Sequence, residues 1–278
     1  MTDVRQSNQF AAFMHDIGWH IERINTTYVY IRKLPILGNF AKISRPKPPF
    51  DYQSIINLKN KLRAYQFKIA PFVSSTVKNY QKIRNNLLDL GIKTEHFPFN
   101  PTTTLQIDLT QSENQLFNNF SEAKRRAVRR AIKNNIEIKK LDNLEDFIAV
   151  RKKQYFPLGF LIVQEMKALW KNFYPENASL LLAYQQANPV GGILLLYYDK
   201  IAYYWFASSL KKGKKLFAPT LLVWEALKLS RRRGCTLFDF EGIYDERFPK
   251  ASESWRGFTK FKEGFGGKKV IFMENFTT

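Results

Sequence analysis

A lysine stands among aromatic residues and glycines in the stretch ESWRGFTKFKEGFGGKK, residues 253–269. Phe261 and Lys262 are followed by the glycine-rich stretch EGFGG, residues 263–267. A fixed ammonium group can stabilise the negative charge that develops on oxygen when an amine attacks an ester. Glycine lets a backbone approach another group closely. The pattern therefore indicates either an acyl-transfer site or a basic surface turn before a final strand.

Other common chemistries find little support in the sequence. The chain contains one cysteine, Cys235, and three scattered histidines, His15, His20 and His96. They lack the spacing of a metal site, and neither a G-x-S-x-G motif nor a phosphate-binding Walker loop occurs. We therefore expect no metal and no bound cofactor. Cys235 is interpreted as a small residue between a helix and a strand.

The charge of the chain narrows the choice of partner. Its 278 residues include 44 Lys and Arg against 24 Asp and Glu, a net charge of +20. Such an excess attracts polyanions such as nucleic acid, anionic lipid or phosphorylated substrates. With 45% hydrophobic residues the chain is not intrinsically disordered. No apolar run reaches the roughly 18 residues of a membrane span, and no signal peptide pattern is present, so we expect a cytoplasmic protein.

Six of the 44 Lys and Arg residues stand within ten positions, 124–133, of residues 112–135, which predict one helix capped by Thr110 or Ser112. An apolar stripe is expected on one face of this helix, formed by Leu116, Phe120, Ala123, Ala127 and Ala131. The basic residues, largely on the opposite face, are Lys124, Arg125, Arg126, Arg129, Arg130 and Lys133. Because residues 124–133 contain no acid, we expect no ion pair within the helix to neutralise this charge. The helix is interpreted as a contact to a nucleic acid backbone or as an ordinary solvated face.

The elements that must position these residues follow from the hydrophobic pattern. In the first part, strands are predicted at 18–24, 26–34, 39–45, 67–73 and 102–110, and helices at 51–66 and 76–91. In the second part, strands are predicted at 135–141, 178–186, 189–199, 201–209, 236–242 and 267–276, and helices at 143–156, 163–174 and 218–234, with a short helix before the last strand. This order indicates an α/β (α+β) fold of mixed sheets with helices on both faces. It resembles two GNAT-like (acyl-CoA N-acyltransferase-like) subdomains, residues 1–109 and 110–278.

The loop expected to hold coenzyme A in such a fold is residues 208–220, SSLKKGKKLFAPT. It contains a single glycine, Gly213, and lacks the Q/R-x-x-G-x-G pattern that cradles a pyrophosphate. This argues against acyl-CoA as the donor. A donor that is already activated, such as an aminoacyl ester on tRNA, needs only positioning and oxyanion stabilisation.

Five segments, taken in order and spacing, resemble the FemA/FemB/FemX family. They are PTTTLQIDL (101–109), AKRRAVRRAIKNN (123–135), AYYWFASS (202–209), APTLLVWEALKLSRRRGCTLFDFEGIYD (218–245) and WRGFTKFKEGFGGK (255–268). The family comprises non-ribosomal peptidyltransferases that add amino acids from aminoacyl-tRNA to peptidoglycan precursors. The resemblance spans nearly the whole chain and is densest from residue 200 onward.

The resemblance implies roles for individual residues. Lys262 would face the tRNA acceptor end and the reacting carbonyl, and Phe261 would pack against the terminal nucleotide or shape the pocket. Tyr204 matches a tyrosine that borders the same channel, although a core tyrosine is the alternative. Asp108 matches an aspartate near the acceptor site, with a structural hydrogen-bonding role as the alternative.

The acceptor side departs from the family pattern. Phe10 and Met14 stand where the family often has a tryptophan and a phosphate-binding lysine. Arg151 and Tyr155 have the spacing of the family's Arg-x-x-x-Tyr pair but lie earlier than expected, so they are candidates for substrate binding. A nucleotide-linked muramyl pentapeptide is the implied acceptor, with a lipid-linked precursor or another amine as alternatives.

These observations lead to a cytoplasmic, monomeric aminoacyltransferase that needs no cofactor. Its expected partners are aminoacyl-tRNA, a muramyl-peptide precursor and, peripherally, the inner membrane surface. One rival is an acyl-CoA N-acyltransferase acting on a polysaccharide or lipid-linked sugar. Another is a non-catalytic protein of this fold that binds RNA or a membrane surface. Neither the amino acid transferred nor the acceptor amine follows from the sequence.

Overall fold

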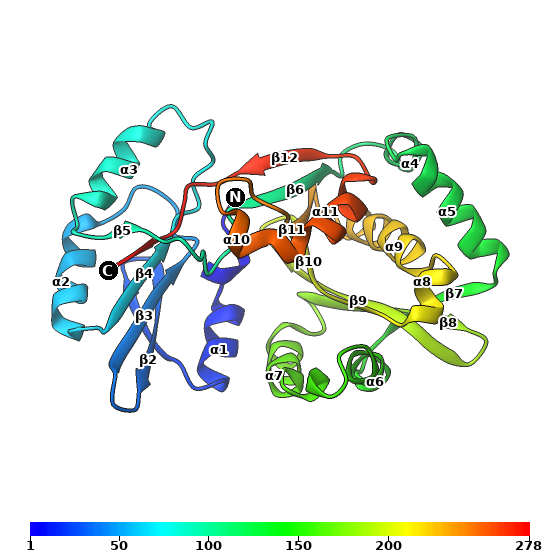
Figure 1. The fold of residues 1–278 in the computed structure, drawn as a ribbon, viewed down its shortest axis with the longest axis horizontal. Coiled ribbons are helices and arrows are strands. Elements are labelled where there is room, and N and C mark those ends of the chain that lie inside the picture. The colour runs from blue at the N-terminus through cyan, green and yellow to red at the C-terminus, as the bar shows by residue number, and fades with distance from the viewer. The chain divides into compact units, whose positions relative to one another are not determined.

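The computed structural model describes residues 1–278, whose course is drawn in Figure 1. Contacts divide the chain into unit 1, residues 1–104, 242–257 and 269–278, and unit 2, residues 105–241 and 258–268. The division expected from the sequence, 1–109 and 110–278, is continuous, whereas each unit combines segments far apart in the sequence. None of the helices combines the length and apolar character that crossing a bilayer requires.

Unit 1 begins with a helix that the sequence analysis did not predict. After the short 3-10 helix η1 (Val4–Gln6), α1 spans Asn8–Asp16. The hydroxyl of Ser7 caps α1 by accepting a hydrogen bond from the backbone N–H of Phe10 at 3.0 Å. Phe10 and Met14 are both buried. The two positions that depart from the family motif therefore contribute to the core.

A six-stranded sheet forms the centre of unit 1, in the order β1-β2-β3-β4-β13-β5. Its strands are β1 (His20–Ile24), β2 (Thr27–Leu34), β3 (Gly38–Ser44), β4 (Gln66–Ala70), β5 (Lys93–Thr94) and β13 (Phe276–Thr277). The helices that pack on this sheet include α2 (Tyr52–Leu62) and α3 (Tyr80–Leu88). β3 and β4 are parallel because α2 carries the chain back between them.

The end of the chain returns to unit 1. The single last strand predicted at 267–276 is wrong: only β12 (Lys268–Ile271) belongs to the other sheet, and β13 follows separately. Phe276 pairs with Ile69 of β4 and with Thr94 of β5. Its side chain is fully buried in the core of unit 1, and this burial explains the return.

A buried carboxylate joins two segments of unit 1, residues 1–104 and 242–257. One oxygen of Asp245, Oδ2, accepts hydrogen bonds from the hydroxyls of Thr102 and Thr103, both at 2.6 Å. The same oxygen accepts from Arg247 Nη2 at 2.7 Å, and the backbone N–H of Asp245 donates to the Ser252 hydroxyl. Burial alone would raise the pKa of Asp245, but the hydrogen bonds from Arg247 and the threonines hold it well below its ordinary value. The carboxylate therefore stays ionised and binds the segment that follows residue 242 to Thr102 and Thr103.

The basic segment of unit 2 forms two helices where the sequence predicted one. They are α4 (Glu113–Asn118) and α5 (Glu122–Lys133). Ser112 caps α4 in a capping box with Gln115, and Ser121 caps α5. Because the break resets the helical phase, Ala123 is exposed instead of buried, and Val128 is buried. The predicted apolar stripe is therefore wrong at Ala123.

The sheet of unit 2 has seven strands in the order β12-β6-β11-β10-β9-β8-β7. The strands not yet given are β6 (Thr103–Asp108), β7 (Ile136–Leu141), β8 (Ala178–Gln185), β9 (Asn188–Tyr198), β10 (Ile201–Ser209) and β11 (Leu237–Gly242). Its further helices are α6 (Glu145–Gln154), α7 (Val163–Phe173), α8 (Lys211–Lys215) and α9 (Ala218–Arg232). Figure 1 shows α5 and α9 on one face of β8 and β9, and α6 and α7 on the other. The expected mixed sheet with helices on both faces is confirmed.

Candidate active site

The parallel pairing of β10 and β11 ends before either strand does. The last registered pair is Tyr203 with Asp239, although β10 continues for six further residues and β11 for three. A register shift between Tyr204 and Phe206 marks a bulge in the pairing of β10 with β9, and a bulge bends its strand. The backbone of Phe240 thus lies just beyond this ladder.

Lys262 reaches this point from α11 (Arg256–Glu263). On α11, Thr259 and Lys262 are buried, whereas Lys260 is exposed, as the helical spacing requires. Lys262 is only 7% exposed, and its Nζ donates a hydrogen bond to the carbonyl oxygen of Phe240 at 2.8 Å. The lysine that the sequence analysis singled out is therefore a buried group at the end of the β10–β11 ladder.

Burial and two carboxylates determine the pKa of Lys262, whose ammonium group lies among aromatic rings. Its Nζ lies 4.8 Å from the ring centroid of Phe258 and 5.8 Å from that of Tyr204. Burial lowers the pKa of Lys262 to about 8, while Glu241 and Asp239 act in the opposite direction. A group with this pKa is mostly protonated at pH 7. A cation with few surrounding waters can stabilise an oxyanion strongly.

Tyr204 lies at the bulge of β10, beside Lys262. Its ring centroid is 5.5 Å from that of Phe240 and 6.4 Å from that of Phe238. Burial raises the pKa of Tyr204, so its phenol is neutral at physiological pH. Tyr204 thus contacts both the aromatic core of unit 2 and the buried lysine. Its role as a substrate contact stays a prediction.

Lys124 lies near Phe261, away from the exposed face of α5. Its Nζ is 3.7 Å from the ring centroid of Phe261 and 4.9 Å from that of Phe265. Its aliphatic chain covers Gly264, where an added Cβ would lie 2.7 Å from Lys124 Cε. Burial lowers the pKa of Lys124 to about 8. The first lysine of the basic run therefore differs from the residues that follow it.

The glycine-rich turn packs against the protein's own backbone. Gly266 and Gly267 have φ angles of +78° and +96°, which favour glycine. A Cβ on Gly267 would lie 2.6 Å from the carbonyl oxygen of Gln106 in β6, and one on Gly266 would lie 2.9 Å from that of Asn119. The interpretation that these glycines admit a ligand is corrected: their close approach is to β6 and the end of α4.

The predicted substrate pair, Arg151 and Tyr155, lies together on α6 and the residue after it. The Arg151 Cζ atom is 4.9 Å from the ring centroid of Tyr155 and 5.1 Å from that of Phe206. Arg151 Nη1 donates a hydrogen bond to the Ser208 hydroxyl at 3.2 Å. Burial lowers the pKa of Arg151, and Tyr155 opposes this shift. Phe206 and Ser208 follow the bulge of β10, so the pair contacts the same strand that carries Tyr204.

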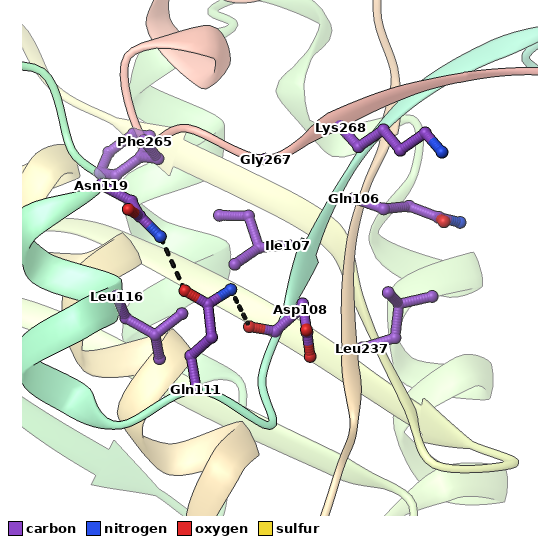
Figure 2. A pocket seen from close by; sticks show the side chains of 10 residues that line it. All are labelled: Gln106, Ile107, Asp108, Gln111, Leu116, Asn119, Leu237, Phe265, Gly267 and Lys268. Atoms are coloured by element: carbon purple, nitrogen blue, oxygen red, sulfur yellow. Dashed lines mark hydrogen bonds between the residues drawn. The ribbon is translucent and has the colours of Figure 1, made fainter.

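Asp108 ends β6 at the edge of a pocket of about 320 Å³ (Figure 2). The pocket is lined by Gln106, Ile107, Asp108, Gln111, Leu116, Asn119, Leu237, Phe265, Gly267 and Lys268. Asp108 Oδ1 accepts hydrogen bonds from the hydroxyl and the backbone N–H of Thr110, at 2.7 and 2.9 Å, and these bonds lower its pKa. Figure 2 shows the Gln111 amide between Asn119 and the Asp108 backbone. These contacts agree with the structural alternative, and the acceptor-site role stays a prediction.

The basic residues of α5 have different surroundings. Arg125 donates hydrogen bonds to the carbonyl oxygens of Asn118 and Phe120, so it holds the link between α4 and α5. Arg126 pairs with Glu122 at 3.4 Å, which corrects the expectation that no ion pair within the helix reduces its charge. The remaining basic residues, exposed on α5, are Arg129, Arg130 and Lys133.

The segment between β10 and α9 was predicted as a loop but contains α8. A Cβ on Gly213 would lie 2.4 Å from the carbonyl oxygen of Val190, so this glycine lets α8 pack on β9. The first turn of α9 contains Pro219, and because proline has no backbone N–H, this turn has one donor fewer for binding a phosphate. No group of three or more His, Cys, Asp or Glu residues lies close enough together to hold a metal ion.

The mixed sheet of unit 2, with helices on both faces and a bulge in β10, has the architecture of a GNAT-like fold. Residues 164–278 match the model of the FemAB family. The crystal structure of FemX is similar over 99% of this chain and 92% of its own, with a TM-score of 0.79 and 16% identity. No curated protein sequence matches the chain.

Two further structures are similar. The C-terminal domain of a putative lysylphosphatidylglycerol synthetase from Agrobacterium fabrum matches 98% of this chain and 88% of its own, with a TM-score of 0.65 and 12% identity. A tandem GNAT protein from the clavulanic acid biosynthesis pathway matches 91% of this chain and 78% of its own, with a TM-score of 0.57 and 10% identity. At these identities the structures speak for the fold alone.

The match of residues 164–278 to the FemAB model, together with the similarity to the FemX structure, confirms the resemblance stated from the sequence. This region contains Tyr204, Phe261 and Lys262. The match to the FemAB family supports a transferase, and the structural neighbours support the fold. The sequence analysis did not predict that Lys124 packs over Phe261, that the ring of Phe258 lies beside Lys262, or that Lys262 donates to the carbonyl of Phe240. For Phe258 a signal was present, since it stands four residues before Lys262 on one helix face.

Proposed function

We propose that this protein is an aminoacyltransferase that moves an amino acid from aminoacyl-tRNA to a peptide amine of a peptidoglycan precursor. The observation that carries the proposal is the buried ammonium of Lys262 at the end of the β10–β11 ladder. It lies in the region that matches the FemAB family. Since aminoacyl-tRNA is made in the cytoplasm, the reaction would take place there, catalysed by a monomer without a bound cofactor.

The proposed reaction needs no energy source beyond its donor. The amine nitrogen of the acceptor attacks the ester carbonyl carbon, and the carbonyl oxygen becomes an oxyanion. Collapse of this intermediate breaks the bond to the ribose oxygen, which takes up a proton, while the amine loses one. Lys262 stabilises the oxyanion, and an ester is thereby exchanged for a more stable amide.

The other residues have supporting roles in this proposal. Phe261 packs against the terminal nucleotide, and Tyr204 borders the channel. Arg151 and Tyr155 bind the acceptor, a precursor linked either to a nucleotide or to a lipid carrier. Asp108 lies near the acceptor-binding site in this proposal. The tRNA phosphates are contacted by the α5 residues Lys124, Arg125, Arg126, Arg129, Arg130 and Lys133. Of these, the exposed Arg129, Arg130 and Lys133 are best placed to do so.

The test is transfer of radiolabelled amino acids from a pool of aminoacyl-tRNAs to muramyl pentapeptides, both nucleotide-linked and lipid-linked. We expect Lys262→Ala to lower the rate by roughly a hundredfold or more, the loss typical of removing an oxyanion stabiliser. Lys260→Ala is the matched control, because Lys260 is exposed on the same helix and should leave the rate unchanged. Absence of transfer from every tRNA by a folded protein would refute the proposal.

An acyl-CoA N-acyltransferase is the second candidate, favoured by the GNAT-like neighbours and by the diverging strands β10 and β11. The environments of Gly213 and Pro219 oppose it, because neither offers the run of free backbone N–H groups that binds a pyrophosphate. Turnover with acyl-CoA in the absence of tRNA would favour this candidate. Binding of RNA or membranes that Lys262→Ala leaves unaffected, without turnover from any donor, would indicate a non-catalytic protein.

A further inference from the structure

An apolar segment of unit 2 lies open to solvent between α6 and α7. Its exposed side chains are Tyr155 (46%), Phe156 (86%), Leu158 (62%), Phe160 (57%) and Leu161 (59%). Scattered single apolar residues on a surface are ordinary, but a contiguous apolar patch commonly marks an interaction site. Five such side chains within seven residues form a patch of this kind.

The backbone of this segment is held against α6. Gly159 is buried, and a Cβ there would lie 2.7 Å from the Cα of Lys152 and 2.8 Å from the carbonyl oxygen of Arg151. The N–H of Leu161 donates to the carbonyl oxygen of Leu158 at 3.1 Å, which closes the turn η2 (Leu158–Phe160). Because the glycine faces the helix, the apolar side chains on either side of it face solvent.

Positive charge lies before the apolar segment. Lys152 and Lys153 are exposed at the end of α6, immediately before it, whereas on α7 after it an exposed Lys167 is accompanied by the exposed Glu165. Between Asp146 and Glu165 the chain contains no acidic residue. An apolar tip with cations at its base is complementary to an anionic bilayer, where lysines meet phosphate groups and apolar side chains enter the acyl boundary.

We propose that residues 155–161 form a membrane-docking loop for an anionic phospholipid bilayer. A protein partner is a poorer fit, because stable protein interfaces bury roughly 800 Å² on each side and are depleted in lysine. A nucleic acid would match the lysines but not the apolar side chains. The inference does not rest on the proposed transfer reaction, since docking can be measured without substrates.

The first test is co-sedimentation with vesicles containing equal parts of phosphatidylglycerol and phosphatidylcholine at about 150 mM salt. We expect Phe156→Ser/Leu158→Ser/Leu161→Ser to lower the partition coefficient at least tenfold. The matched control is Phe97→Ser/Ile132→Ser, which removes side chains of similar exposure, 63% and 59%, from other segments and should bind as wild type does. Lys152→Gln/Lys153→Gln should weaken vesicle binding, and raising the salt concentration should weaken the binding of wild type in the same way. Wild type should bind poorly to vesicles of pure phosphatidylcholine.

A second test reports insertion itself. Cys235, the only cysteine, is buried, so an environment-sensitive fluorophore can be attached selectively to Phe156→Cys or, as a control, to Ile132→Cys. Vesicles should shift the emission to the blue at position 156 and not at position 132. Vesicle binding without a shift at position 156 would show attraction by charge alone and overturn the proposal. A dimer that the triple variant dissociates, with no vesicle binding, would assign the surface to a second copy of the chain.

Discussion

Lys262 donates a hydrogen bond from Nζ to the carbonyl oxygen of Phe240 at 2.8 Å, at the first residue of β11 beyond its pairing with β10. This contact satisfies a backbone acceptor that lies past the end of the ladder between these strands. It also holds a cation where the strands cease to pair. The same geometry therefore stabilises the fold and places charge for the proposed chemistry.

The lowered pKa of Lys262 predicts the pH dependence of the proposed transfer. Since oxyanion stabilisation requires the ammonium form and the pKa is about 8, the contribution of Lys262 should be nearly full at pH 7 and decline as pH rises through 8. Lys262→Arg keeps its charge throughout this range and should move the decline to higher pH. Rates measured from pH 6 to 10 for both proteins check this. A wild-type rate that rises steadily to pH 10 would contradict the assignment.

Truncation of Lys124 should lower stability, whereas truncation of Lys133 should weaken tRNA binding. Lys124→Ala removes the cation above Phe261 and the chain that covers Gly264, so we expect a loss of roughly 1–2 kcal/mol in the free energy of unfolding. Lys124→Arg should retain most of it. Lys133→Ala should leave stability unchanged and weaken tRNA binding in a salt-dependent manner. Urea unfolding and tRNA binding at two salt concentrations separate the effects, and equal stability losses would contradict this distinction.

Gly267 should not tolerate a side chain. Gly267→Ala places a Cβ 2.6 Å from the carbonyl oxygen of Gln106 at a φ of +96°, so the expected cost is roughly 2 kcal/mol or more. Gly257→Ala is the control, because no atom lies within 4 Å of the added Cβ and the position is helical. There alanine should be neutral or stabilise by up to about 1 kcal/mol. Thermal unfolding of both variants measures this difference. A Gly267→Ala variant as stable as wild type would refute the prediction.

Asp245→Asn should destabilise unit 1 by roughly 2–3 kcal/mol at pH 7, because hydroxyl and guanidinium donors lose a charged acceptor. The pKa of Asp245 is held below its value in the unfolded chain, near 3.9. Its contribution is therefore full above about pH 5 and is lost as pH falls through the folded-state pKa. The gap between wild type and variant should narrow on acidification, while exposed Glu246→Gln, the neighbouring control, should change little.

Local patterns predicted most of the elements that position the site. The apolar runs of β8, β9 and β10 and the periodicity of α9 are visible in the sequence because these elements bury one or both faces along their length. The break before α5 was missed although Ser121 is an ordinary N-cap, because the apolar spacing continues across it for one turn. Likewise, the sequence analysis interpreted Phe10 and Met14, on the buried face of α1, only as departures from a family motif.

The sequence by itself determined the class of fold and the family resemblance, and it made Lys262 a candidate, since these depend on residue types in a local order. Only the tertiary structure decided what Lys262 contacts. Its partner, the carbonyl of Phe240, lies just after the point where β10 and β11 cease to pair. The tertiary structure also decided that Lys124 leaves the basic face and that Phe276 returns to unit 1. Both outcomes depend on burial against residues distant in the chain, which no local pattern encodes.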